Sequence, residues 1–448
     1  TDWPAWVGRR WPQKWVRLSM VVPVGRAMLA DTIDRLTATL RGMASPHGAA
    51  SRTILFTAFE PSGDAHAAPV IRALLELDPG LRIAAWGGPR MREAGAEMVG
   101  VTAEDGAMGL AGLGKINMVR RVRREVADWS LANRVVLHVP VDSPAANFPV
   151  VKAIRPRGIR TVHLVAPQMW AWGEWRLAKL RRLTDLVLCL LPFEEAWFRE
   201  RGVQAAFIGH PVINRGFDEA AIKSAQAHLP SGSPKLALLP GSRSQELKAN
   251  LRSMVEAFIE LQGRHRGATG VIVAANENLA RLAVSLVPSL PNGLHVVVGG
   301  IDGALRWCDL AINVSGTVSL DVARHGKPMV GLYRVSWPSY LISKLVLRAP
   351  FRLLPNIIAG KEVVPEFVPT AQGAGAFADA ADQFLRDSRR AAETSAELRR
   401  MMAPYAGHRP GPEAAALILR VLAKGALSKD EIAAAIASVR GAAPARSP

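Results

Sequence analysis

The chain is poor in the features that mark secreted, cysteine-ligated or membrane-spanning proteins. Its 448 residues include only two cysteines, Cys189 and Cys308, and both lie within apolar runs. We therefore expect buried free thiols in a reducing compartment, rather than a disulfide framework or a metal site. No apolar run reaches the roughly 18 to 20 residues of a membrane-spanning helix. Because no long apolar core follows Arg9 and Arg10, a cleaved signal peptide is not expected either.

Acidic residues are also scarce, since 38 Asp and Glu against 56 Lys and Arg give a formal net charge of +18. This excess is typical of an arginine-rich proteome, or of a protein that binds an anionic membrane surface, nucleic acid or an acidic substrate. The sequence has no zinc-finger spacing, aromatic RNP run or basic heptad region, so nucleic acid is not expected as a partner. The hydrophobic content of 49% supports full cores, and the length predicts two domains.

Tryptophan is concentrated at the start of the chain, where Trp3, Trp6, Trp11 and Trp15 are interleaved with basic residues. Such a mixture suits a lipid–water interface. The alternatives are an appended segment that packs its indoles on the main body, or mistranslated upstream sequence. Because residues 44–51 are rich in Ala, Ser, Pro and Gly and predict a linker, residues 1–51 are set apart as an extension.

An alternation of short apolar strands and helices begins at Arg52 and restarts near residue 234. Such alternation predicts parallel sheets covered by helices on both faces. We expect an α/β fold of two Rossmann-like, doubly wound domains that face a central cleft at the carboxyl ends of their strands. The expected divisions are the extension over 1–51, a first domain over 52–212, a linker over 213–233, a second domain over 234–425 and a final helix and tail over 426–448.

The individual elements follow from the same pattern. The expected strands are 53–57, 81–86, 135–141, 161–166, 186–191, 206–208, 235–239, 270–274, 294–298, 310–314 and 328–331. The expected helices include 65–77, one that begins over 150–154, 177–183, 193–201, 245–261 and, behind a capping box at 428–431, 432–439.

Acidic residues follow two expected strands of the first domain. Glu60, Ser62, Gly63 and Asp64 form a loop at a helix start, which favours an anionic group or a ligand hydroxyl, although helix capping by Ser62 or Asp64 is the alternative. Asp142 follows another strand, where a carboxylate that points into the cleft suits general-base chemistry. Capping and turn formation are the commoner roles of such an aspartate.

Two loops of the second domain suit a diphosphate. Gly241, Ser242 and Arg243 join a strand to a helix, so their backbone N–H groups and the guanidinium predict an anion site; an ordinary turn with a surface arginine is the alternative. The segment Ser315-Gly316-Thr317 offers N–H and hydroxyl groups, and Asp321 lies one helical turn further on, where a carboxylate can accept hydrogen bonds from ribose hydroxyls. The alternative there is an N-capped helix with a solvated Asp321.

Two basic amphipathic segments, 106–126 and 337–354, each mix apolar residues with several arginines or lysines. Either suits an anionic bilayer, and a buried helix with a solvated basic edge is the alternative.

With these loops located, the sequence resembles the lipid-A-disaccharide synthase family from about residue 53 to about residue 368. The resemblance rests on an ordered set of short motifs, which includes Glu60-Pro-Ser-Gly-Asp64, Gly88-Pro-Arg-Met91, Asp142-Ser-Pro144, Trp170-Ala-Trp172, Gly209-His-Pro211, Leu238-Leu-Pro-Gly-Ser-Arg243, Ser315-Gly-Thr317 and Leu354-Pro-Asn356. It implies the GT-B fold and an inverting glycosyltransferase that moves 2,3-diacylglucosamine from UDP-2,3-diacylglucosamine to 2,3-diacylglucosamine 1-phosphate, giving the β-1,6 disaccharide and UDP.

The resemblance also assigns roles and surroundings. It implies a first domain on the acceptor and membrane side, a second domain that binds the UDP-sugar, no required metal or other cofactor, and peripheral attachment to the cytoplasmic face of the bacterial inner membrane through its anionic surface. A homodimer is left open. Asp142 matches the family's essential aspartate and is the expected base, Glu60 matches an acidic ligand-orienting residue, and Arg243 matches the phosphate-binding arginine. Asn356 matches a functionally important asparagine, and Asp321 stands where the family usually has Glu.

The sequence departs from the family pattern around the acceptor side. After Asp142 it continues Ser143-Pro-Ala145-Ala-Asn147-Phe148, with added residues and no second aspartate, and the usual arginine after the Trp-Ala-Trp motif is Gly173. A GT-B relative with another UDP-sugar or acceptor, and a non-catalytic nucleotide-sugar-binding membrane protein, therefore remain as alternatives.

Overall fold

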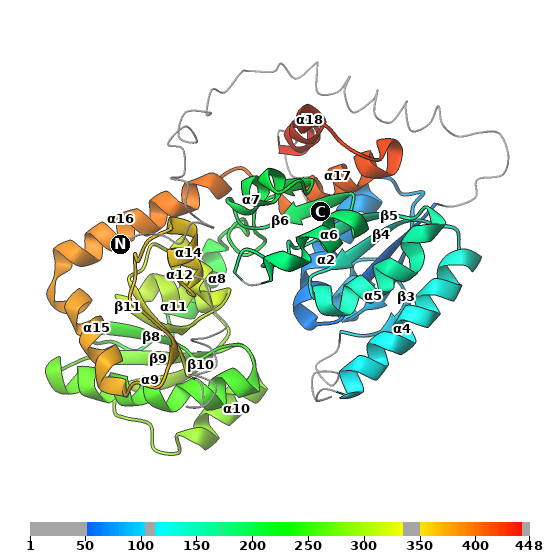
Figure 1. Cartoon of the computed structure of the whole chain (residues 1–448). Coiled ribbons are helices and arrows are strands. Elements are labelled where there is room, and N and C mark those ends of the chain that lie inside the picture. The colour runs from blue at the N-terminus through cyan, green and yellow to red at the C-terminus, as the bar shows by residue number, and fades with distance from the viewer. Residues whose placement is uncertain (1–51, 104–112, 172, 335–349, 441–448) are drawn as a thin grey trace.

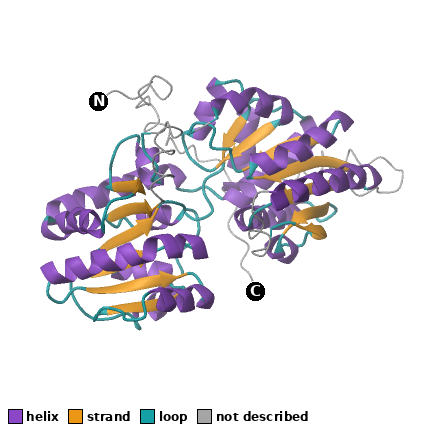
Figure 2. Cartoon of the chain, turned by 60° about the horizontal axis from the view of Figure 1, so that its bottom comes forward, coloured by secondary structure: helices purple, strands orange, loops and turns teal. Residues whose placement is uncertain are grey.

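The computed structural model of the chain describes residues 52–103, 113–171, 173–334 and 350–440. The expectations for the tryptophan-rich extension, for residues 106–112 and for residues 337–349 lie outside this range. Two α/β domains lie side by side (Figure 1), and Figure 2 shows a layer of strands between helices in each of them. Within the described residues, no helix is long and apolar enough to cross a membrane.

The first domain is built on a seven-stranded parallel sheet, in which a switch of strand order lies between β1 and β4. Across the sheet, the strands are β3 (Glu97–Val101), β2 (Arg82–Gly87), β1 (Thr53–Ala58), β4 (Val135–Val141), β5 (Arg160–Leu164), β6 (Leu186–Cys189) and β7 (Ala205–Phe207). All six residues of β1 are buried, as expected for a strand covered on both faces. The carboxyl ends of β1 and β4 are adjacent, since Ala58 pairs with Val141, and this adjacency brings the loops that follow them together.

Helices cover both faces of this sheet. They are α2 (Pro61–Leu77), α3 (Pro89–Glu93), α4 (Leu113–Ala132), α5 (Pro144–Ile154), η3 (Arg155–Arg157), η4 (Glu174–Arg176), α6 (Leu177–Leu183) and α7 (Glu194–Glu200). The described part of the basic segment 106–126 lies on α4, whose Val122 and Val126 are buried in the domain core. Arg120, Arg121, Arg123 and Arg124 are exposed. The apolar side of α4 is therefore covered by protein over residues 117–126, which is the buried-helix alternative for this part of the segment.

The second domain repeats the arrangement with six parallel strands and the same order of connections. Across the sheet, the strands are β10 (Leu294–Val298), β9 (Thr269–Ala274), β8 (Lys235–Leu239), β11 (Leu310–Val314), β12 (Met329–Arg334) and β13 (Glu366–Thr370). Both sheets thus have the Rossmann strand order, and the expected α/β fold is confirmed.

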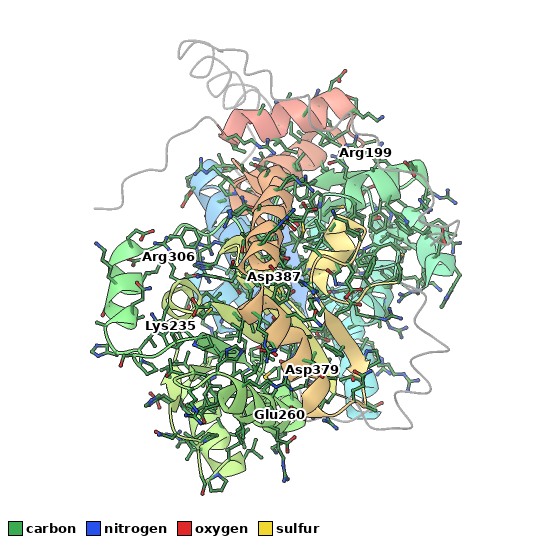
Figure 3. All side chains as sticks on the ribbon, turned by 90° about the vertical axis from the view of Figure 1, so that its left-hand side faces the viewer. Arg199, Lys235, Glu260, Arg306, Asp379 and Asp387 are labelled. Carbon is green, nitrogen blue, oxygen red and sulfur yellow. The ribbon has the colours of Figure 1, made fainter. Side chains whose placement is uncertain are left out.

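One helix of the second domain, α8 (Glu219–Gln226), lies in the expected linker. The other described helices of this domain are α9 (Ser244–Arg264), α10 (Glu277–Leu286), α11 (Ile301–Trp307), α12 (Val318–Arg324), α14 (Leu354–Ala359), α15 (Ala374–Arg386) and α16 (Ser388–Met402), and the short η5 (Ala403–Tyr405) follows α16. Helix α8 packs on α11, so residues 219–226 of the expected linker are a structured part of this domain. Arg264 joins α9 to α15 through Asp379 at 2.7 Å and also pairs with Glu260 of its own helix at 3.5 Å; both carboxylates are labelled in Figure 3.

The last two helices, α17 (Pro410–Lys424) and α18 (Lys429–Arg440), return to the first domain. Helix α17 packs on α2, and its Leu417, Ile418 and Val421 belong to the core of the first sheet. The capping box before α18 is confirmed, because Ser428 and Glu431 exchange backbone-to-side-chain hydrogen bonds. The chain therefore crosses between the domains twice, although residues 410–424 were expected to belong to the second domain.

The two crossings are joined by one side chain. The Asn214 oxygen accepts the N–H of His210 at 2.9 Å, and its amide donates to the Tyr405 carbonyl at 2.5 Å. Gly209 has a φ of +82°, and a Cβ there would lie 2.5 Å from the Cβ of His408. The Gly209-His-Pro motif therefore serves the close approach of the two crossing segments.

The packing of both cysteines agrees with the sequence. Cys189 and Cys308 are free and fully buried in separate apolar clusters, and burial raises the pKa of each thiol. Such thiols are poor nucleophiles, which is consistent with packing roles.

Candidate active site between two Rossmann-like domains

Asp142 stands at the carboxyl end of β4 in a backbone conformation that few residues adopt. Its φ is +51°, and Ser143 follows with a φ of +34°. The Asp142 N–H donates to Leu164 O of β5 at 2.9 Å. Non-glycine residues in the left-handed region cost free energy and persist where the surroundings enforce them, often at functional sites.

The side chain of Asn147, in the first turn of α5, supplies part of that enforcement. Its amide donates to Val141 O at 2.9 Å and to Asp142 O at 2.8 Å, and its oxygen accepts the hydroxyl of Thr57 at 2.7 Å. Asn147 is fully buried. This amide therefore ties β1, the end of β4 and the first turn of α5 into one unit around Asp142.

The Asp142 carboxyl is held in a mixed electrostatic environment. Burial raises its pKa above the ordinary aspartate value, and the charge of Glu60 raises it further. A hydrogen bond from Ser143, the charge of Arg243 and a hydrogen bond from Ser62 act in the opposite direction. The net shift is upward, which makes the carboxylate a stronger base than an exposed aspartate.

These neighbours come from both domains. Glu60 and Ser62 lie in the loop from β1 into α2, whereas Arg243 lies in the loop from β8 into α9 of the second domain. Because Arg243 acts electrostatically on Asp142, the two loops expected to carry the base and the anion site lie opposite one another. Sequence spacing alone did not connect them.

The turn before α9 differs from an open anion cradle. The carboxylate of Glu246 accepts the N–H groups of Ser242 and Arg243 at 3.1 Å and 3.3 Å, and pairs with the Arg243 guanidinium at 2.9 Å. Gly241 has a φ of +110°, and a Cβ there would lie 2.5 Å from a Glu246 oxygen. The expected free N–H donors therefore already have an acceptor within the chain, and Arg243, whose side chain is half exposed, presents the remaining donors of its guanidinium.

The second expected diphosphate loop lies at the end of β11. The Ser315 hydroxyl donates to Arg352 O at 3.1 Å. A Cβ at Gly316 would meet no atom within 4 Å, so open space adjoins this backbone, and Thr317 is exposed. These features are compatible with a ligand beside the loop.

Asp321, on α12, is buried rather than solvated. Its carboxylate lies 3.3 Å from the guanidinium of Arg215, which also contacts Asp302 at 3.1 Å. Burial raises the pKa of Asp321 to about 6, Arg215 and Arg324 lower it, and Asp302 raises it. A residue of the linker thus reaches the carboxylate expected to face the ribose.

Three further expected residues serve the framework in this structure. Gly63 packs the start of α2 on β1 and β4, since a Cβ there would lie 3.1 Å from Ala58. Asp64 is 2% exposed, and its carboxylate accepts the N–H groups of Gly88, Arg90 and Met91, each at 3.0 Å. Asp64 therefore caps α3. Capping was the alternative expected for this residue, but the helix that it caps is α3 and not α2, on which it lies.

Asn356 is fully buried at the start of α14. Its oxygen accepts the N–H groups of Val363 and Val364, and its amide donates to Val364 O and to Glu366. In this structure Asn356 holds the segment between α14 and β13.

Sequence reasoning missed the supporting residues Asn147, Glu246 and Arg215. Asn147 was noted only as part of a departure from a family pattern. A glutamate at the third helical position was the one available signal, because that position is where a capping-box carboxylate stands. No local pattern connects Arg215 with Asp321.

Two Rossmann-like domains with facing loops at the ends of β1, β4, β8 and β11 define a protein of the GT-B fold. The calicheamicin glycosyltransferase CalG4 matches 84% of this chain and 100% of its own, with a TM-score of 0.57 at 17% identity. The UDP-GlcNAc 2-epimerase of Neisseria meningitidis, solved with UDP-GlcNAc, matches 84% of this chain and 100% of its own with a TM-score of 0.53 at 12% identity.

The sequence narrows this class to one family. The model of the lipid-A-disaccharide synthetase family matches residues 54–409. The lipid-A-disaccharide synthase of Granulibacter bethesdensis is 36% identical over 70% of this chain and 81% of its own length. That of Geobacter sulfurreducens is 31% identical over 78% of this chain and 91% of its own. The chain belongs to the lipid-A-disaccharide synthase family, as the motifs predicted.

Proposed function

We propose that this protein is an inverting glycosyltransferase that forms the lipid A disaccharide. It transfers 2,3-diacylglucosamine from its UDP derivative to the 6-hydroxyl of 2,3-diacylglucosamine 1-phosphate, and UDP leaves. The observation that carries the proposal is the meeting of Glu60, Asp142 and Arg243, from two domains, around one buried carboxyl. Membership of the lipid-A-disaccharide synthase family supports the choice of sugar and product.

Asp142 acts as the base in this proposal. The UDP-linked sugar is α and the product is β, so a single displacement requires a group that takes the proton of the acceptor hydroxyl as the bond to carbon forms. Asp142 stands at a strand end, and its pKa is raised by burial. Glu60 lies beside it and orients the acceptor.

Arg243 stabilises the departing UDP. The bond to the leaving phosphate breaks as negative charge develops on its oxygens, and a fixed guanidinium offsets that charge without moving. The loop of Ser315, Gly316 and Thr317 contributes N–H and hydroxyl donors from the neighbouring strand end, and Asp321 accepts hydrogen bonds from the ribose once Arg215 gives way.

The acylated substrates define where the protein works. Molecules with acyl chains reside in a bilayer, so the enzyme reaches them from the cytoplasmic face of the inner membrane as a peripheral protein. The positive net charge of +18 favours attraction to anionic lipids.

Turnover of UDP-2,3-diacylglucosamine with 2,3-diacylglucosamine 1-phosphate in mixed micelles, followed by mass spectrometry, tests the proposal. We expect disaccharide and UDP from the natural chain. Asp142→Ala should lose on the order of a thousandfold or more in kcat, because general-base catalysis contributes roughly 10²–10⁴-fold. UDP binding, measured by calorimetry, should be retained.

Asp379→Asn provides the matched control. Asp379 is an exposed carboxylate of α15 in the second domain (Figure 3), paired with Arg264, and its removal should leave turnover unchanged. A natural chain that binds UDP and forms no disaccharide would reject the proposed activity, and full activity of Asp142→Ala would reject the role of the base.

A further inference from the structure

Trp175 is the most exposed large apolar side chain among the residues that the structure describes. It is 82% exposed, against 62% for Leu131, the next in order. Trp175 lies in η4, immediately before α6, and the guanidinium of Arg176 lies 5.8 Å from the centroid of its ring. A single exposed apolar side chain is ordinary on a protein surface, so Trp175 indicates a contact surface only in combination with its charged neighbours.

The helix that follows Trp175 is strongly basic. Lys179, Arg181 and Arg182 are exposed on α6, and none of the three is in an ion pair with a carboxylate of the described chain. The only acidic residue of the segment 174–183 is Glu174, and Arg201 already pairs with it at 2.9 Å. The surface formed by Trp175, Lys179, Arg181 and Arg182 therefore combines an exposed indole with three cations that have no carboxylate partner within the described chain, and Lys179 lies 5.2 Å from the centroid of the Phe148 ring.

This surface is joined to the rim of the candidate site. The segment from β5 to η4 leaves the same sheet edge as Asp142, since Asp142 N–H donates to Leu164 O. Within it, Trp170 packs with Phe193, and Leu354 of the second domain packs against the cluster that these two rings form with Leu191. Helix α6 continues from this segment and packs on α5 (Figure 1), the helix that begins beside Asp142.

We propose that the surface formed by Trp175, Lys179, Arg181 and Arg182 docks the protein on an anionic lipid bilayer beside its active site. The indole suits the headgroup region, where its apolar body and N–H are both accommodated, and the three cations suit lipid phosphates. Charge complementarity selects a bilayer with anionic lipids rather than an apolar protein partner. The inference rests on the proposed function, because acylated substrates give a reason for the site to open toward a membrane.

Co-sedimentation with vesicles that contain phosphatidylglycerol, compared with vesicles of phosphatidylcholine alone, tests this docking on the full chain. Trp175→Ser should weaken binding to the anionic vesicles about tenfold, from the loss of one inserted side chain. The triple change Lys179→Ser, Arg181→Ser, Arg182→Ser should weaken it about a hundredfold and flatten its dependence on salt. Because these side chains are exposed, thermal unfolding should be unchanged.

Matched controls come from the second domain. Ile259→Ser removes an apolar side chain that is 50% exposed on α9, and the triple change Lys223→Ser, Arg252→Ser, Arg281→Ser removes three exposed cations from α8, α9 and α10. Binding of these controls at the level of the natural chain supports the proposal. Equal weakening by the controls, normal binding by the α6 variants, or no binding of the natural chain to anionic vesicles overturns it.

Turnover in mixed micelles separates this proposal from the activity. Micelles deliver both substrates without a bilayer, so the α6 variants should keep their micellar kcat and lose turnover only on vesicles. Vesicle binding that depends on α6 without any disaccharide in micelles would reject the activity and keep the docking surface. Normal micellar turnover together with unchanged vesicle binding of the variants would reject the surface and keep the activity.

Discussion

At the scale of single residues, Asp142 combines two costly features. Its backbone is in the left-handed region, and its carboxyl is buried next to another acid. Both features reduce stability, and both place a strengthened base at a fixed position. Asn147, whose amide donates to the carbonyls of Val141 and Asp142, offsets part of that cost.

The neighbours of Asp142 predict opposite shifts in the pH profile of kcat/KM. A base must be deprotonated, so turnover falls as the pH drops through its pKa. Burial raises the pKa of Asp142, Glu60 raises it further, and Arg243 lowers it. Glu60→Gln should therefore move the acid limb to lower pH, and Arg243→Gln should move it to higher pH, whatever either change does to the maximal rate.

The control for this experiment is Glu260→Gln, in an exposed part of α9 (Figure 3). It should leave the limb in place. Limbs that move in the same direction for both site variants would contradict the assignment of the titrating group to Asp142.

The candidate site residues could be predicted individually from the sequence, but the contacts between them could not. Asp142, Glu60 and Arg243 were each found because a charged side chain follows an apolar strand. Asn147 contacts Thr57, and Arg215 contacts Asp321. Because these partners are far apart in the sequence, no local sequence pattern predicts the contacts. Asp64 shows the converse, because a capping residue was expected but the helix it caps lies 25 residues further on.

At the scale of elements, the start of α9 depends on Glu246. Its carboxylate takes the place of a ligand at the N–H groups of Ser242 and Arg243 and holds the guanidinium of Arg243. Glu246→Ala should lower the free energy of unfolding by about 1 kcal/mol, the usual cost of a lost N-terminal cap. It should also raise the KM for the UDP-sugar, since Arg243 loses the partner that orients it.

Chemical denaturation and steady-state kinetics measure both effects. Glu256→Ala, on the same helix, removes only an exposed pair with Arg252 and should cost at most a few tenths of a kcal/mol. If Glu256→Ala raised the KM for the UDP-sugar as much as Glu246→Ala, the proposal that Glu246 orients Arg243 would be rejected.

Most elements followed from apolar runs, and those that did not had conflicting local signals. Strands β4, β10 and β11 and helix α6 have the expected bounds. Strands β3 and β13 were missed. Both are short and partly exposed, and β13 contains Pro369, which argues against a strand. Helix α5 begins at Pro144 rather than near residue 150, since a second proline, Pro149, interrupts its pattern.

At the scale of the whole molecule, order along the chain is not order in space. The sequence placed the division at residue 425, because α17 follows the second domain without a break in composition. The structure gives α17 to the first domain, where it covers α2. The chain passes between the two domains twice, and the Asn214 side chain links the two connecting segments. The relative position of the domains therefore depends on the C-terminal helices as well as on the linker.

A core substitution in α17 should therefore destabilise the other end of the sequence. Leu417 is fully buried in the core that includes β1 and β4, so Leu417→Ala should cost about 2–5 kcal/mol. Hydrogen exchange should then speed up in β1 and β4, more than 270 residues earlier, and stay slow in β8 and β11. Leu419→Ala, at a partly buried position of the same helix, is the control and should cost less. Faster exchange confined to β8 and β11 would mean that α17 stabilises the second domain instead, since local opening follows the contacts that are lost rather than proximity in sequence.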